Sequence, residues 1–228
     1  MRDGLVVIMA AATGSLDVVA FLGLGGVFVS VITGNVVLFG IGIAKLEPTF
    51  VLRSGVATAA YGAGVALGVL VAGRVSDDQP LWPRRVSGAL LVELVLLAGF
   101  CAGWELAGPK RTTSQDVVFL ALAAATMGVQ SATVVRLDVP GFSSTYLTST
   151  YIRAITGLVT GGREHQAAKL LALCAALAGA VVGAVILSAA PRWVPAFALA
   201  LLAAVGTLGT ALSGRGGPLG ASTVASSK

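Results

Sequence analysis

The sequence predicts an all-α integral membrane protein, a polytopic helical bundle of about six to eight transmembrane segments built from two similar halves. Hydrophobic residues make up 56% of the chain and charged residues only 11%, whereas soluble domains carry about 25% charged residues. The mean hydropathy is +0.93. Apolar stretches of about 20 residues, the length that crosses a bilayer as a helix, follow one another with short polar connections.

The first half is expected to contain four apolar segments. Arg2 and the alanines that follow it resemble a signal peptide, but the internal repeat described below indicates that this segment belongs to the fold. Connections are expected at Gly25-Gly26, at Lys45 to Pro48 and in the polar stretch 74–85. The segments cover about residues 5–24, 27–44, 50–73 and 86–107.

The second half is expected to contain four more segments, followed by a tail. The tail, residues 213–228, is rich in glycine, serine and threonine and is expected to be disordered. Residues 1–212 then form a single transmembrane domain. The segments cover about residues 116–135, 143–160, 166–190 and 193–212.

Matching residues at a fixed offset predict that the halves arose by duplication, with repeat one at about 5–107 and repeat two at about 116–212. Thr33 matches Thr148, 115 residues later, and Gly64 and Gly68 match Gly179 and Gly183 at the same offset. Ala10 to Thr13 likewise resembles Ala123 to Thr126.

The number of crossings depends on the second segment of each half. Residues 27–44 would be about 27 Å long as a helix, enough to cross the membrane. Four crossings in each half, eight in all, are therefore favoured, and the two halves would share one orientation. The alternative is six crossings, in which segments one and two share one broken crossing and the halves are inverted.

Lysine and arginine predict the orientation, because they are enriched in cytoplasmic loops. In the eight-crossing scheme most of them lie on the side of the N-terminus. We therefore expect a multi-pass membrane protein with both termini on the cytoplasmic side.

Composition also excludes several function classes. The net charge of +5 is scattered through short loops, so no nucleic-acid partner is expected. His165 is the only histidine, and Cys101 and Cys174 lie inside apolar runs, so no metal and no cofactor are expected. Hydrolase, zinc-protease, nucleotide-binding and Cys-x-x-Cys motifs are absent, so the chain is not expected to be an enzyme.

Polar residues inside apolar segments are the candidate substrate-binding groups. Such groups in a hydrocarbon environment usually face other helices or a wet cavity. A glycine beside them would loosen the helix, as in transporters with discontinuous helices. Interhelical hydrogen bonding that only holds the bundle together is the equally weighted alternative. The candidates are Asp17, Thr33, Gly34, Asn35, Gln130, Thr145, Thr148 and Thr150.

Three ionisable residues lie deep in the predicted segments, namely Asp17, Glu93 and Arg153. A charge near the bilayer centre is costly, so each is expected to face the bundle interior or a partner. Arg153 paired with Asp17 or Glu93 is one hypothesis. A structural ion pair, or an arginine that extends to the membrane surface, is the alternative.

Small residues spaced four apart predict close helix packing. Gly64 with Gly68, and Gly179 with Gly183, have this spacing. Packing within one chain is the main expectation, and a homo-oligomer contact is the alternative.

Two motifs give the chain a resemblance to a known family. Gly14-x-x-Asp17, residues 21–28 and Thr33-Gly34-Asn35 form the first, and residues 128–132 followed by 144–148 form the second. Together they resemble the signatures of the YoaK-type bacterial membrane protein family (domain of unknown function 1275). Ser131 and Ser149 stand where that family usually has asparagine and glycine. The resemblance implies an inner-membrane protein, usually of about six spans, without a settled activity.

Two functions are compatible with these features. The first is a transporter or permease for an unknown small-molecule substrate, in which Asp17 or Glu93 binds a coupled proton. The second is a membrane scaffold or sensor that transports nothing. In both cases the lipid bilayer is the obligatory partner.

Overall fold

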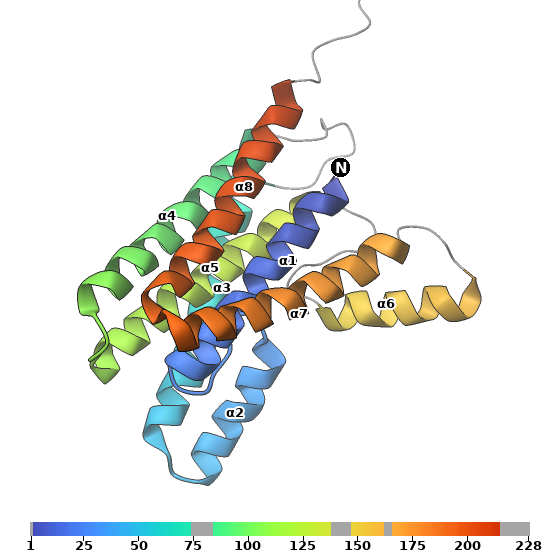
Figure 1. Cartoon of the computed structure of the whole chain (residues 1–228). Helices are drawn as coiled ribbons and strands as arrows, with labels where there is room; N and C mark the ends of the chain where they lie inside the picture. Colours follow the sequence, from blue (N-terminus) through green and yellow to red (C-terminus); the bar gives the residue numbers. More distant parts are fainter. Residues whose placement is uncertain (1, 74–83, 138–146, 162–165, 215–228) are drawn as a thin grey trace, which may run out of the picture.

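In the computed structural model the described residues are 2–73, 84–137, 147–161 and 166–214, and within these ranges the chain is helical and forms no strand (Figure 1). A π-helical turn, Val19–Gly23, extends the first helix, and a 3₁₀ turn, Pro191–Trp193, precedes the last. The helices are α1 (Arg2–Val18), α2 (Ile32–Ala44), α3 (Pro48–Ala72), α4 (Arg84–Ala107), α5 (Thr113–Leu137), α6 (Leu147–Thr160), α7 (Gln166–Ala189) and α8 (Val194–Gly214).

Six of these helices are long and apolar enough to cross a membrane: α1 with its π-helical turn, α3, α4, α5, α7 and α8. The polytopic all-α fold class is therefore confirmed. α2 has 13 residues and α6 has 14, or about 20 Å at 1.5 Å per residue. Because the hydrocarbon core is about 30 Å thick, neither helix is long enough to cross alone over the residues that the structure describes. The lengths of the described helices therefore fit the alternative of six crossings rather than the favoured eight.

α2 begins later than the sequence predicts, at Ile32 rather than near Val27. The predicted start of the sixth segment, near Ser143, lies outside the described residues. Conversely, α8 continues through Ser213 to Gly214, so the first two residues of the expected disordered tail are helical. The rest of that tail lies outside the described residues.

The six long helices pack in corresponding pairs across the two halves. α3 packs along α5, and α7 packs along α1. α4 also contacts α5, as α8 contacts α1, and α4 and α8 touch each other. The short helices lie at the periphery, α2 against α3 and α6 against α7 (Figure 1). This pairing is expected if each half is a copy of one unit whose third segment packs on the first segment of the other copy. The duplication itself stays a prediction.

Glycines occupy the tightest helix crossings. A Cβ at Gly64 would overlap the backbone carbonyl of Ala125 on α5, and a Cβ at Gly179 would overlap that of Ala11 on α1. Gly68 lies against Ala132 on α5, and Gly183 lies against Ser15 on α1. These glycines let the paired backbones approach closely within one chain.

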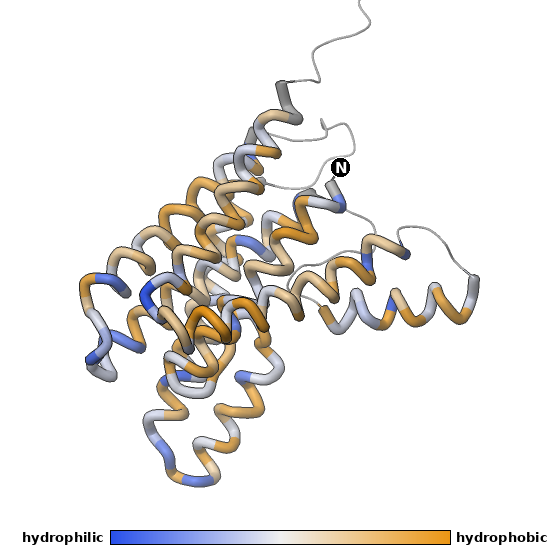
Figure 2. Tube along the Cα trace, in the orientation of Figure 1, coloured by the Kyte–Doolittle hydropathy of each residue, from blue (hydrophilic) through white to orange (hydrophobic). Residues whose placement is uncertain are grey.

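Most of the helical residues are apolar (Figure 2), and many large apolar side chains are exposed on the exterior, as expected of a surface that contacts lipid. Leu70, Val95, Leu177 and Val185 are all more than half exposed. The interior is a continuous apolar cluster, and its largest fully buried members include Met9, Leu16, Leu97, Phe100 and Met127.

Candidate functional site

The helical path is broken between the first long helix and α2. Residues 24–31 form an irregular connection that turns through Gly25 and Gly26, whose φ angles are +104° and +79°. Only glycine adopts such angles without strain. A Cβ at Gly25 would also overlap the guanidinium group of Arg53. The pair of glycines therefore determines where the helix stops.

Asp17 holds the second part of this connection. Its Oδ1 atom accepts hydrogen bonds from the backbone N–H groups of Val29 and Ser30, both at 2.9 Å. Its Oδ2 atom accepts the hydroxyl hydrogen of Ser30 at 2.5 Å. Three donors on one carboxylate stabilise its charge and satisfy backbone groups that have left the helical ladder.

Asn35 holds the same connection from the other side. The N–H of Phe28 donates to Asn35 Oδ1 at 3.0 Å, and Asn35 Nδ2 donates to the carbonyl of Phe28 at 2.6 Å. The side chain is fully buried. Asp17 and Asn35 therefore satisfy successive peptide groups, which is why an apolar run such as Val27–Val31 stays out of the helix.

The triplet Thr33-Gly34-Asn35 thus lies in the first turn of α2 and not in the middle of a span, which corrects its predicted place. Thr33 is exposed, and Gly34 packs against Val31 and Phe28. Of the three, Asn35 alone is buried.

Gln130 lies in a second buried polar cluster, between α1 and α5. Its Nε2 atom donates to Thr13 Oγ1 at 2.9 Å and to the Met9 carbonyl at 3.2 Å. Next to it, Ser131 and Tyr61 share a hydrogen bond of 2.6 Å between α5 and α3. Thr13 and Asp17 are four residues apart and lie one turn apart on the same side of α1. A row of hydrogen-bonded polar groups therefore follows the inner side of α1. It runs from the Met9 carbonyl through Thr13 to Asp17, which bonds to Ser30 in the connection after the helix.

The polar motif of the second half does not join this cluster. Thr148 is exposed in the first turn of α6, Thr150 is buried, and Thr145 lies outside the described residues. α2 and α6 pack on different long helices, so their first turns do not meet. Among the described residues, Thr148 and Thr150 therefore lie apart from Asp17 and Asn35.

The predicted pairing of Arg153 is wrong. Arg153 is exposed on α6, and Asp17 is bonded to Val29 and Ser30 instead. Glu93 is fully buried, and it forms no ion pair among the described residues. The depth of Arg153 was overestimated because α6 is a short peripheral helix.

A charged cluster that was not among the predicted site residues connects the break to neighbouring helices. Arg111 binds Asp116 at 2.9 Å and donates to the Gly23 carbonyl at 3.1 Å. Arg53 approaches Asp116 at 3.9 Å. The end of the first helix is therefore anchored to α3 and α5. In the sequence, the only sign of this cluster is the pair of opposite charges, Arg111 and Asp116, at the start of the fifth segment.

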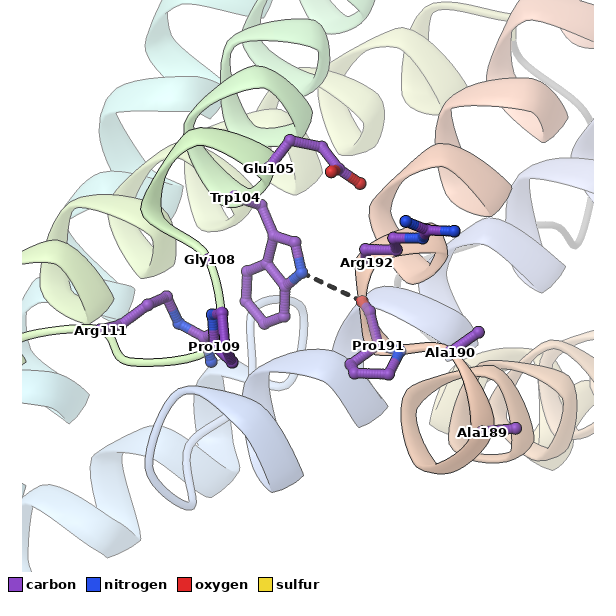
Figure 3. A pocket seen from close by; sticks show the side chains of 9 residues that line it. All are labelled: Trp104, Glu105, Gly108, Pro109, Arg111, Ala189, Ala190, Pro191 and Arg192. Carbon is purple, nitrogen blue, oxygen red and sulfur yellow. Dashed lines mark hydrogen bonds between the residues drawn. The ribbon is translucent and has the colours of Figure 1, made fainter.

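A cavity of about 500 Å³ adjoins this cluster, between the end of α4 and the turn from α7 to α8 (Figure 3). Trp104 forms one wall, with its indole N–H bonded to the Pro191 carbonyl at 3.0 Å. The Arg111 guanidinium lies 3.7 Å from the centre of a Trp104 ring, a cation–π contact. Glu105 and Arg192 add charge to the lining. Since Trp104 also lies against Gly23, the cavity lies beside the broken helix.

These features define a class: a polytopic helical membrane protein with a discontinuous first helix and a polar interior along α1. Residues 5–208 match the family model described as "Protein of unknown function (DUF1275)", and the chain belongs to that family. This confirms the resemblance drawn from its motifs.

A curated relative is the UPF0700 transmembrane protein YoaK of Bacillus subtilis (strain 168). It is 32% identical over 150 residues, which cover 65% of this chain and 64% of the relative. The match thus spans less than two thirds of that relative's length. No solved structure matches the chain.

Proposed function

We propose that this protein is a small-molecule transporter or permease of the bacterial cytoplasmic membrane. The observation that carries the proposal is the break between α1 and α2, where Asp17 and Asn35 hold irregular backbone. A cavity lies at the end of the first helix, where its Trp104 wall contacts Gly23. Irregular backbone in a membrane domain is tolerated where it is buried in protein or lines a water-filled space. Discontinuous helices of this kind form substrate sites in many secondary transporters.

The cavity supports a class of substrate. Its lining includes two arginines, Arg111 and Arg192, and one acid, Glu105. Because Arg111 is paired with Asp116, the remaining charges of the lining are Arg192 and Glu105, one of each sign. This arrangement favours a zwitterion, whose carboxylate would bind Arg192. Trp104 provides an aromatic wall for the apolar part of such a solute.

The six-crossing scheme gives the same orientation as the eight-crossing scheme. Chain order then assigns ten of the fifteen lysines and arginines to the side of the N-terminus and five, Lys45, Arg53, Lys110, Arg111 and Arg192, to the other. Because cytoplasmic segments are enriched in these residues, both termini are proposed to lie in the cytoplasm. The cavity of Figure 3 then faces outward.

A thermal-shift screen of the purified protein against small carboxylates, amino acids and their amides tests the proposal. A ligand that binds the folded state raises the apparent melting temperature. The variant Arg192→Gln should weaken a carboxylate ligand by about tenfold, which corresponds to about 1.4 kcal/mol. Lys110→Gln is the matched control, because Lys110 is an exposed cation near the cavity that does not line it.

Transport itself is tested in liposomes with the ligand from the screen. The double variant Asp17→Asn, Asn35→Ala should lose uptake or efflux, because it removes both clamps of the break. Unchanged transport in that variant would rule out the break as part of the pathway.

A membrane scaffold or sensor is the second candidate, and one observation favours it. The polar atoms of Asn35 and the carboxylate of Asp17 are all bonded within the chain, which suits a static core. Ser131→Cys, in a background with Cys101 and Cys174 changed to serine, separates the two candidates. A water-soluble thiol reagent should reach the thiol introduced at position 131 in a transporter that opens. In a scaffold it should label only a surface control such as Lys110→Cys.

A further inference from the structure

Glu93 is a buried acid near the middle of α4. Its side chain is fully buried, and neither carboxyl oxygen forms a hydrogen bond with any residue that the structure describes. In this respect it differs from Asp17, whose oxygens accept three hydrogen bonds.

The surroundings of Glu93 are apolar. The residues one and two turns away on the same side of α4 are Ala89, Leu90, Leu97 and Phe100, and all are buried. This side of α4 packs into the interior cluster, with α5 and α8 as its main neighbours and α3 as a lesser one.

No counter-charge lies at the level of Glu93 on these helices. Residues 117–135 of α5 and 194–214 of α8 contain no ionisable side chain. In α3, residues 54–72 contain only Tyr61, whose hydroxyl is bonded to Ser131. On α4 itself the nearest ionisable groups are Cys101 and Glu105 toward one end and Arg84 and Arg85 at the other. An ionised carboxylate here would be both buried and unpaired, which is among the most costly arrangements in a protein.

A groove reaches the neighbourhood of Glu93 from outside. It lies between α4 and α8 and has a volume of about 330 Å³. Leu90 and Leu94, which flank Glu93 on α4, line the groove, and Leu94 approaches Gly206 of α8. The hydroxyl-bearing residues of the lining are Ser87, Thr207 and Thr210. A small separation of α4 from α8 would therefore open a path with polar groups toward the buried carboxyl.

We propose that Glu93 is a proton-binding site: it is a neutral carboxylic acid while α4 and α8 are closed on it, and it exchanges its proton when they separate. This inference rests on the proposed transport function. Within that function it identifies the coupled ion as a proton and places the proton on Glu93 rather than on Asp17. The experiments below need no substrate, so they report on Glu93 whether or not transport is found.

The first experiment uses dicyclohexylcarbodiimide, an apolar reagent that modifies protonated carboxyls, on the full-length protein in lipid nanodiscs. The acid proton moves to a nitrogen of the reagent and the carboxyl oxygen bonds to its central carbon; the acyl group then migrates to nitrogen. The product is an N-acylurea that retains every atom of both reactants. We expect the adduct on the peptide containing Glu93 and its loss in Glu93→Gln.

The second experiment does not depend on access of the reagent. When a carboxyl group is neutral in the folded protein but ionised in the unfolded one, the free energy of unfolding falls as pH rises. From about pH 6 to pH 9 the melting temperature of the wild type should therefore fall relative to that of Glu93→Gln, which cannot ionise. Glu47→Gln, a change of an exposed acid, should leave the wild-type pH dependence unaltered.

Each outcome decides the proposal. Diverging pH curves support it, and an adduct on Glu93 strengthens it. Parallel curves for the wild type and Glu93→Gln overturn it. Specific stabilisation of the wild type, but not of Glu93→Gln, by millimolar sodium also overturns it, because the bound cation would then be a metal ion.

Discussion

Asn35 is a small side chain that replaces two hydrogen bonds of a missing helical turn. Its amide oxygen and nitrogen both bond to the backbone of Phe28. A buried peptide group in a membrane domain has no water to bond with, so the amide determines whether the connection can be irregular at all. The first role of Asn35 is therefore structural, because it allows the backbone to leave the helix at this point.

Asn35→Ala should destabilise the protein by about 2 kcal/mol, because it leaves the partly buried N–H and carbonyl of Phe28 without their partner. Thr33→Ala, two residues away on the exposed side of α2, is the matched control and should change stability by less than about 0.5 kcal/mol. Thermal unfolding in detergent, followed by circular dichroism, measures both. Equal stability of the two variants would mean that the loop does not depend on this clamp.

Asp116 interacts with two arginines near the break between α1 and α2. Its carboxylate binds Arg111 at 2.9 Å and approaches Arg53 at 3.9 Å, and all three side chains are less than one fifth exposed. Asp116→Asn should therefore cost about 1 to 2 kcal/mol, between the values for exposed and buried pairs.

The loss in Asp116→Asn should shrink at high salt, because salt screens the charges that remain partly open to water. Unfolding at low and at about 1 M salt checks this. A salt-independent loss would assign the effect to packing and not to charge.

At the scale of the helices, glycines determine how closely the backbones of paired helices from the two halves approach each other. Gly62 and Gly64 lie on the same helix, α3, but only Gly64 faces α5 at contact distance. A methyl group at 64 must push the α5 backbone away, whereas one at 62 meets nothing within 4 Å.

Gly64→Ala should therefore destabilise the protein by about 3 kcal/mol, at the upper end of the usual cost of overpacking. Gly62→Ala should be neutral or slightly stabilising, because alanine favours the helix more than glycine does. The same unfolding assay compares them. If the two variants are equally stable, the interface between α3 and α5 is looser than the structure indicates.

The helices show how far the sequence carries the fold. Long apolar runs and their polar connections place α3, α4, α5, α7 and α8 to within a few residues, because burial in lipid requires such runs. The break after α1 is not visible in hydropathy, since Val27–Val31 is as apolar as a span. It depends on Asp17 and Asn35, which act across 12 and 7 residues. Gln130 and Thr13 are likewise brought together only by the packing of α1 on α5.

At the scale of the whole molecule, the number of crossings decides which loops share a side of the membrane. Lys45 lies in the turn between α2 and α3, Lys110 between α4 and α5, and Gly161 at the end of α6. With six crossings, Lys45 and Lys110 lie on one side and Gly161 on the other. With eight crossings all three lie on the same side, whichever way the protein is inserted.

The single variants Lys45→Cys, Lys110→Cys and Gly161→Cys, with Cys101 and Cys174 changed to serine, separate the schemes. A membrane-impermeant thiol reagent added to intact cells should label the thiols at positions 45 and 110, and should label the thiol at position 161 only after the cells are opened. Labelling at position 161 alone in intact cells would keep six crossings but place the termini outside. Equal behaviour of all three thiols would contradict six crossings, and α2 and α6 would then have to cross together with part of their flanking chain, because their helices alone are about 20 Å long.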